Sequence, residues 1–540
     1  MTADRAFFGG HVETFDESGS SGEAMAIGNG RVLGVGSHQE IEALCGPETR
    51  RTDLMGRAVL PGFIDTHMHL EKVSHEFTML RLETARGIAD VLDAVGNQAE
   101  HLRNSGLRGV WIRCFADNAA WNEKNLAEGR LPTREELDKV ALGLPVYLYR
   151  RPDRAVINSA GMELMATKLA EISDGFDRAT GYLTGKPVRI LNDAIYTLSM
   201  ADGVYRQAIL AEACQRLLAM GITTIVDPGL AGAFDSSWAL YQESEKRGEL
   251  PQRILLMNRF DWRKPYQSEK ERVLQSAALP NTGSDGLQAW ALKFLLDGEF
   301  VNAWMRDGET PTARASRHYT PEELRDLLLL AAERRWPVCI HAMGGGAIEA
   351  IIDAVQNLRD EGVYLEHGQV NIAHAFLMDV LDMQACVRLG IKLSLNPALA
   401  YVYSDEMRQA WGPLSARAVP LGTLASLEIR FAGGSDTHPC APLAGASIAV
   451  QRKAWDGSSF GRHEAITPRQ ALSMFTRDAG DYINRADLGT LEAGSAADFV
   501  VWSQNPLEVD PRLWPDVSPE FVVRAGVTAW SSPETVSTKQ

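Results

Sequence analysis

The chain has 540 residues, of which 45% are hydrophobic and 23% are charged. This composition is typical of a soluble globular protein, and the length exceeds what one compact core usually holds, so we expect two or three domains. The 54 basic and 70 acidic residues give a net charge of -16, and the basic residues are scattered along the chain. This balance argues against a nucleic-acid partner.

Cysteine spacing and hydropathy bear on the compartment. The six cysteines lie far apart and form no CxxC pair, so neither a disulfide framework nor a cysteine zinc site is indicated. The amino terminus lacks a basic start followed by an apolar run, and no later stretch approaches about 18 uninterrupted apolar residues. We therefore expect a cytoplasmic protein that has no membrane partner.

Both ends of the chain read as short strands joined by turns. In residues 5–57, Asn29-Gly30 between two apolar runs predicts a type I′ hairpin. Near the other end, residues 489–503 and 520–530 again read as strands with glycine turns. We expect residues 1–57 and 487–540 to form one small β-sandwich domain, because neither end alone can bury much surface.

Residues 57–66 are apolar and β-prone, which predicts a strand buried on both faces. The motif PGFIDTHMHLE, residues 61–71, begins within this strand and places two histidines just after it. Residues i and i+2 of a strand share a face, so His67 and His69 can reach one metal ion. An HxH pair also arises by chance or for packing, and the downstream residues decide between these interpretations.

Residues 72–205 are expected to be an α/β insertion over the mouth of a barrel, where such segments often supply a substrate lid. Helical runs and strand candidates lie at 87–104, 109–117, 133–142 and 145–150. Thr133 with Glu136 three residues later predicts a capping box at the start of one helix.

From about residue 206 strands and helices alternate, which predicts parallel strands. The predicted strands lie at 222–227, 253–260, 290–298, 337–344, 363–368, 391–397 and 426–436. With the strand that precedes His67 they make a closed (β/α)8 barrel of the TIM type. We assign residues 58–71 and 206–486 to this barrel domain.

Polar residues that can bind metal fall at the predicted carboxyl ends of these strands, where barrel active sites are built. His67 and His69 end strand one, and Lys293 lies inside strand four. His341, His367 and Asp436 end strands five, six and eight. Taken singly, each histidine could be a satisfied core residue and Asp436 could cap a loop, but their joint placement favours a shared site.

Lys293 is buried among apolar strand residues, which is costly for an ammonium. Either Asp297 or Asp436 pairs with it, or CO2 adds to the amine and the resulting carbamate bridges two metal ions. Nitrogen and oxygen ligands suit Zn2+, with manganese or iron as alternatives. Such cations would polarise a carbonyl and lower the pKa of a bridging water, and Asp436 could transfer its proton to the leaving nitrogen.

Seven motifs, in this order along nearly the whole chain, resemble the amidohydrolase superfamily. They are PGFIDTHMH, ALKFLLDG, CIHAMGGGAIEAIIDA, YLEHGQV, GGSDTHP, TPRQALSMFT and GTLEAGSAADFVVW. The likeness is to amidohydrolase family 3, the branch of YtcJ-like proteins and N-substituted formamide deformylases. It implies a two-metal hydrolase whose centre contains the residues His67, His69, carboxylated Lys293, His341, His367 and Asp436.

The sequence of the insertion differs from the motifs usual in that branch. Pro152-Asp153-Arg154 stands where a DGH motif is usual, and CFADNAAW, which contains Trp121, replaces an aromatic-acidic segment. Arg154 could hold a substrate carboxylate bidentately or form a salt bridge of the lid. Trp121 and Asp297 are further candidates for substrate contact. The remaining histidines near the motifs are expected to be surface or supporting residues rather than ligands, namely His75, His374 and His438.

These patterns predict a metal-dependent hydrolase that cleaves a non-peptide C–N bond in a small amide, formamide or carbamate.

 The runner-up is a deaminase or a hydrolase that opens a cyclic amide in a heterocycle. A non-catalytic scaffold is disfavoured, because it would have no need for a buried lysine beside several histidines. The expected partners are a small-molecule substrate and a second copy of the chain in a homodimer.

Overall fold

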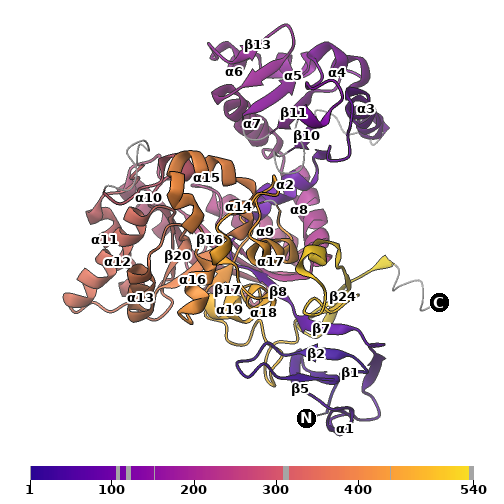
Figure 1. Ribbon diagram of the computed structural model, residues 1–540, viewed down its shortest axis with the longest axis vertical. Coiled ribbons are helices and arrows are strands. Elements are labelled where there is room, and N and C mark those ends of the chain that lie inside the picture. Colours follow the sequence, from indigo (N-terminus) through magenta and orange to yellow (C-terminus); the bar gives the residue numbers. More distant parts are fainter. Residues whose placement is uncertain are drawn as a thin grey trace. The chain divides into compact units, whose positions relative to one another are not determined.

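The computed structural model describes residues 2–104, 110–116, 123–150, 153–307, 316–437 and 439–533. The chain divides into two compact units (Figure 1). One contains Met1–Leu70 together with Ala213–Gln540, and the other is Glu71–Glu212. Every residue of the candidate site described below, apart from two candidates in the insertion, belongs to the first unit. The expected split of the first unit into a sandwich domain and a barrel domain stays a prediction.

The first unit contains a barrel of parallel strands, as predicted. Along the sheet they follow the order β8 (Phe63–Asp65), β15 (Ile222–Asp227), β16 (Arg253–Arg259), β18 (Leu287–Leu295), β19 (Val338–Ala342), β20 (Val370–His374), β21 (Lys392–Leu395) and β22 (Ala432–Gly433). The short strand β17 (Thr282–Gly283) pairs antiparallel with β18. Beyond β22 the sheet closes onto β8, because the Thr66 amide donates to the Gly433 carbonyl at 3.1 Å. The (β/α)8 fold is therefore confirmed.

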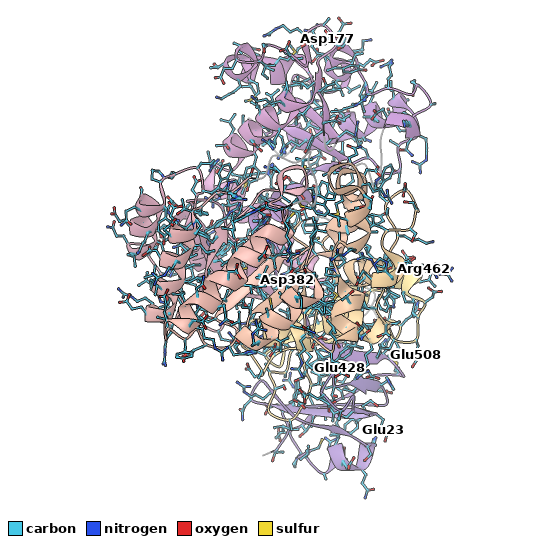
Figure 2. All side chains as sticks on the ribbon, turned by 60° about the vertical axis from the view of Figure 1, so that its left-hand side comes forward. Glu23, Asp177, Asp382, Glu428, Arg462 and Glu508 are labelled. Carbon is cyan, nitrogen blue, oxygen red and sulfur yellow. The ribbon has the colours of Figure 1, made fainter. Side chains whose placement is uncertain are left out.

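Helices follow most of these strands and cover the barrel (Figure 1). The longer ones are α8 (Gly203–Leu218), α9 (Phe234–Lys246), α10 (Tyr266–Leu274), α11 (Pro321–Arg334), α12 (Gly345–Asp360), α13 (Val380–Leu389) and α17 (Pro442–Gln451). The shorter ones are α14 (Pro397–Val402), α15 (Ser404–Trp411), α16 (Leu421–Ser426), α18 (Pro468–Ser473) and α19 (Arg477–Tyr482). Asp379 and Asp382, the latter labelled in Figure 2, form a capping box that starts α13.

Strand six does not lie where the sequence predicted it. Residues 363–368 form no strand, whereas β20 begins at Val370 and ends at His374. The run 363–368 resembles a strand because Val363, Tyr364 and Leu365 are apolar, yet Tyr364 and Glu366 are exposed. All residues of β20 are buried, as a parallel barrel strand requires.

The predicted strand at 57–66 is two strands with different partners. β7 (Ala58–Pro61) pairs with β2 (His11–Glu13) and with β23 (Phe499–Trp502), whereas β8 enters the barrel. Gly62 separates them, and a Cβ at this position would lie 2.4 Å from the Thr223 hydroxyl oxygen. Only glycine fits so close to the neighbouring strand.

Both chain ends contribute to the same β-sheet, as predicted. Its order is β25 (Val527–Ser531), β24 (Pro519–Arg524), β23, β7, β2 and β3 (Ser21–Gly22). A second sheet has the order β5 (Arg31–Gly36), β4 (Ala24–Gly28), β1 (Arg5–Phe8) and β6 (Arg50–Asp53). Asn29 and Gly30 join β4 to β5 with φ values of 51° and 71°, which fits the predicted type I′ turn.

The second unit has a mixed sheet flanked by helices. The sheet order is β13 (Phe176–Asp177), β14 (Tyr182–Thr184), β12 (Arg154–Ile157), β11 (Val146–Arg150), β10 (Ile112–Ala116) and β9 (Leu80–Arg81). The helices are α2 (Leu70–Phe77), α3 (Ile88–Asn104), α4 (Arg134–Val140), α5 (Ser159–Leu164), α6 (Ala166–Ala170) and α7 (Lys186–Ser199). The capping box of Thr133 and Glu136 is present at the start of α4.

No helix within the described ranges is both long and apolar enough to cross a lipid bilayer.

Candidate metal centre

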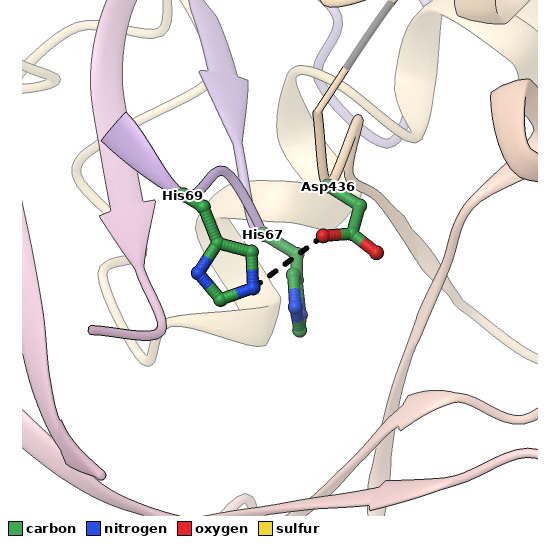
Figure 3. A group of neighbouring side chains, drawn as sticks. All are labelled: His67, His69 and Asp436. Atoms are coloured by element: carbon green, nitrogen blue, oxygen red, sulfur yellow. Dashed lines mark ion pairs between the residues drawn. The ribbon is translucent and has the colours of Figure 1, made fainter. Parts of the chain in front are cut away.

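Three side chains meet at the carboxyl ends of strands β8 and β22 (Figure 3). One ligand atom from each of His67, His69 and Asp436 lies within 4.8 Å of the others. The Asp436 carboxylate is 3.5 Å from Nε2 of His69. Imidazole nitrogen and carboxylate oxygen are common zinc ligands. Three of the predicted ligands are therefore brought together.

Main-chain contacts hold these residues in place. The Asp436 amide donates to the His67 carbonyl at 2.6 Å, and the His69 amide donates to the Asp436 carbonyl at 3.0 Å. Asp436 has a φ of 67°, a conformation that costs energy for a residue other than glycine. The barrel thus closes through its own candidate ligands, and the strained backbone aims the carboxylate at the histidines.

Asp65 supports the turn that carries both histidines. Its carboxylate is fully buried and accepts hydrogen bonds from the His67 amide at 3.0 Å and the Ser435 amide at 3.2 Å. Burial raises the pKa of Asp65 to about 7 despite these hydrogen bonds. The residue joins the end of β8 to the segment after β22, and so fixes the distance between the histidines and Asp436.

Two further histidine rings extend the group from His67, first His374 and then His341. The ring centroid of His374 is 4.8 Å from that of His67 and 4.4 Å from that of His341. Burial lowers the pKa of His341 to about 3 and holds the pKa values of His67 and His374 well below the usual range. All of these rings are therefore neutral, which is the form that binds a metal ion.

Hydrogen bonds orient the His341 and His374 rings. Nδ1 of His374 lies 2.9 Å from the Asn396 amide oxygen, and Nε2 of His341 lies 3.2 Å from the Gly298 carbonyl. Each of these nitrogens must carry the proton, because its partner only accepts. Nε2 of His374 and Nδ1 of His341 are left as the nitrogens with a lone pair for a ligand.

The predicted position of His367 is wrong. It lies three residues before β20, at the amino end of that strand, and it is exposed. Ligands gather at the carboxyl ends, so His367 faces away from the group and instead lines a shallow groove with Val387 and Gly390. His374, which the sequence reasoning set aside, occupies the place expected for it. The unbroken apolar run from Val370 to Ala373 was the signal that could have located the strand.

Lys293 lies buried inside β18, as predicted, and its Nζ is 3.7 Å from Sγ of Cys339. Burial lowers its pKa. Neither Asp297 nor Asp436 lies within ion-pair distance of Nζ in the described structure, so the salt bridge considered from the sequence is absent. After burial, the charge of Lys293 is the next cause that lowers the pKa values of His67 and His341. It also lowers the pKa of His374, after burial and the charges of His341 and His67.

Asp297, a candidate for substrate contact, is buried and bonded to the main chain. Its side chain is 0% exposed, and its two carboxylate oxygens accept hydrogen bonds from the amides of Met343, Gly344 and Trp304 at 2.9–3.0 Å. Burial raises its pKa to about 7. Asp297 also lies 3.6 Å from Nε2 of His341. It therefore positions the loop after β19 and the His341 ring.

The two candidates in the insertion stay predictions. Arg154 is half exposed and forms an ion pair with Glu123 at 2.9 Å, which is the second of the two interpretations considered for it. Arg150 also pairs with Glu123, at 3.1 Å. Trp121 and His438 lie outside the described residues.

The donor set fits a divalent cation. Neutral imidazoles, a carboxylate and a buried lysine converge, and Nδ1 of His67 is buried with no hydrogen-bond partner among the described residues. Buried polar atoms normally have a partner. Such an atom beside other ligand atoms is explained if an ion completes the group.

Comparison with known proteins gives the family. A model of the amidohydrolase family matches residues 51–529. An N-substituted formamide deformylase of Arthrobacter pascens is 26% identical over 523 residues, which cover 92% of this chain and 93% of that protein. The putative amidohydrolase YtcJ of Bacillus subtilis (strain 168) is 25% identical over 527 residues, covering 93% and 95%.

A solved structure shows the same fold. The crystal structure of an uncharacterized metal-dependent hydrolase from Pyrococcus furiosus matches with a TM-score of 0.73 at 22% identity, covering 93% of this chain and 100% of that one. The family match spans most of the chain, and the fold agrees with it. The chain belongs to the amidohydrolase family, whose enzymes hydrolyse carbon–nitrogen bonds.

Proposed function

We propose that this protein is a metal-dependent hydrolase that cleaves a non-peptide C–N bond in a small amide, formamide or carbamate. The observation that carries the proposal is the convergence of neutral histidines, Asp436 and buried Lys293 at the carboxyl ends of the barrel strands. The likeness to an N-substituted formamide deformylase over almost the whole chain supports this substrate class.

The residues that would hold the metal are His67, His69, Lys293, His341, His374 and Asp436. Nitrogen and oxygen donors of this kind favour Zn2+. A bound cation would polarise the substrate carbonyl and lower the pKa of a water molecule towards neutrality. Three buried residues behind these donors hold them in a fixed geometry through hydrogen bonds, namely Asp65, Asp297 and Asn396.

Asp436 is the proposed general acid and base. Its side chain is 20% exposed, whereas that of neighbouring His69 is 9% exposed. Among the proposed ligands it is thus suited to accept a proton from the attacking water and deliver it to the leaving nitrogen. Contact with solvent then lets the carboxylate return to its starting protonation state.

Lys293 is the proposed site of a carbamate. Its lowered pKa favours the neutral amine, which is the form that attacks CO2. The new N–C bond releases one proton and leaves an anionic group with two oxygens. This reaction replaces a group that is costly to bury as a cation with an anion beside the metal ligands.

Elemental analysis of protein purified without chelator, combined with peptide mass measurement of Lys293, tests the proposal. About two equivalents of zinc with a CO2 adduct, followed by hydrolysis of small amides or formamides, would support it. One equivalent with an unmodified lysine and release of ammonia would favour the deaminase or ring-opening alternative. No bound metal after attempted reconstitution would refute the enzyme mechanism.

A further inference from the structure

Arg259 is a positively charged residue beside the candidate centre that the mechanism above does not use. It is the last residue of β16, and its Cα pairs in register with that of Lys293 on β18. The next residues, Phe260 and Phe294, pack together with ring centroids 5.4 Å apart. Successive strand residues point to opposite faces. Arg259 and Lys293 therefore share the other face, which is the face that carries the metal ligands.

The positive charge of Arg259 affects the pKa values of several residues of the centre. Burial lowers the pKa values of His67, His341 and Lys293, and the charge of Arg259 lowers them further. In return, Asp436 raises the pKa of Arg259 against the larger lowering by burial. These effects agree with the register of β16 and β18, which places Arg259 next to Lys293 on the face that carries the candidate ligands.

No described carboxylate forms a direct ion pair with the Arg259 guanidinium, although Asp436 acts on it from a distance. Its Nε is buried and has no hydrogen-bond partner in the described structure. The nearest acidic residues along the chain are already paired, since Asp261 accepts from Arg263 at 2.7 Å and Glu269 accepts from Arg272 at 3.0 Å. Arg259 is partly buried, and withdrawing an unpaired guanidinium from water costs free energy that a bound anion would offset.

Two arginines of the same unit that are more deeply buried than Arg259 show how such a charge is normally satisfied. Arg253 bonds to Asp285 at 2.9 Å and also to Asp498. Arg452 donates to main-chain carbonyls, among them that of Ala418 at 2.7 Å. Arg259 differs from both, because no described group of the protein accepts a hydrogen bond from its Nε.

We propose that Arg259 binds a carboxylate of the substrate, so that the enzyme acts on amides whose acid group lies a few bonds from the scissile C–N bond. This inference rests on the proposed hydrolase function. A guanidinium offers parallel N–H donors that match a carboxylate bidentately. The substrate class is then the N-acyl or N-formyl amino acids and related acids.

Two pairs of compounds test the proposal. N-Formylphenylalanine, as both enantiomers, is compared with N-formyl-2-phenylethylamine, and N-formylalanine with N-formylethylamine. Within each pair the compounds differ only by the carboxylate. The zinc-loaded enzyme is expected to prefer the acid of at least one pair, with a kcat/KM about 100-fold higher than that of the neutral amide.

Arg259→Gln is expected to reduce this preference about 100-fold, chiefly by raising KM for the acid, while the metal content stays the same. Arg259→Lys should restore part of it, since the charge remains but the bidentate geometry is lost. Arg263→Gln is the matched control. Arg263 lies four residues away, is 62% exposed and pairs with Asp261, so its loss should leave the preference unchanged.

Three outcomes would overturn the inference. Equal hydrolysis of acid and neutral amide by the wild type would show that no carboxylate is recognised, while the proposed function would stand. Equal losses on both compounds in Arg259→Gln would assign Arg259 to holding the centre. Hydrolysis of neither member of either pair by metal-loaded enzyme would refute this substrate class, and an active panel of other amides would then preserve the proposed function.

Discussion

Replacing His374 by alanine is the sharpest test of the metal centre, because the matched variant His367→Ala makes the same chemical change on the same segment. The sequence reasoning assigned His367 to the centre, whereas the structure places His374 there. The His374 ring lies 4.8 Å from that of His67 and 4.4 Å from that of His341, and His367 is exposed. The two variants therefore have opposite expected outcomes.

The size of the effect follows from the ligand set. Structural zinc sites with four ligands bind with about 10–16 kcal/mol, so one ligand is worth on the order of 3 kcal/mol. A loss of this size weakens metal binding about 100-fold. Exposed His367 has no such role, and its replacement should change stability by less than about 0.5 kcal/mol and leave metal affinity unaltered.

Competition with a graded zinc chelator measures both affinities, and circular dichroism checks that each variant is folded. Retained zinc affinity in folded His374→Ala would refute the placement of this ring among the ligands. Loss of zinc in His367→Ala, with normal affinity in the other variant, would restore the assignment made from the sequence.

Three further predictions concern other residues. Asn396→Ala removes the acceptor 2.9 Å from Nδ1 of His374, so zinc affinity by chelator competition should fall about 10–100-fold. Lys293→Ala and Asp436→Asn should each abolish turnover in an amide hydrolysis assay, because one removes a metal-site group and the other the proton carrier, while circular dichroism stays unchanged. Burial holds the pKa of His75 at about 2, below the value near 6.5 of an unfolded chain, so the stability that it contributes above pH 6.5 is lost as the pH falls. Between pH 6.5 and 5 the wild type should lose about 2 kcal/mol relative to His75→Phe in urea unfolding.

Each of these has a result that would contradict it. Unchanged zinc affinity in Asn396→Ala would mean that the His374 ring is held by other contacts. Near-normal turnover in Lys293→Ala or Asp436→Asn would remove that residue from its proposed role. A stability difference between wild type and His75→Phe that is the same at both pH values would show that His75 titrates in the folded protein as it does in the unfolded chain.

The fold was predictable where local patterns coincide with tertiary burial. The strand at 222–227 and the capping box of Thr133 and Glu136 were found at the predicted residues. Each of these features depends on a few neighbouring side chains. A continuous apolar run or a hydroxyl three residues before a glutamate suffices to specify it.

The site was less predictable because it depends on where strands end and which way side chains point. A shift of strand six by a few residues exchanged His367 for His374. The split of the first strand at Gly62 required knowledge of Thr223 on the neighbouring strand. Arg259 carries no motif, and only the absence of a described partner distinguishes it from other arginines. These properties arise from contacts distant in sequence, which periodicity does not encode.

The pairing of β7 with β23 has a consequence for how the protein is made. The segment that leads into His67 has its neighbours far downstream, since Thr66 bonds to Gly433 and Pro61 pairs with Phe499. A chain emerging from the ribosome cannot complete these pairings until almost all of its 540 residues have been synthesised. The candidate ligands His67, His69 and Asp436 therefore come together only after synthesis has passed Asp436, and chains that end before it lack one of them.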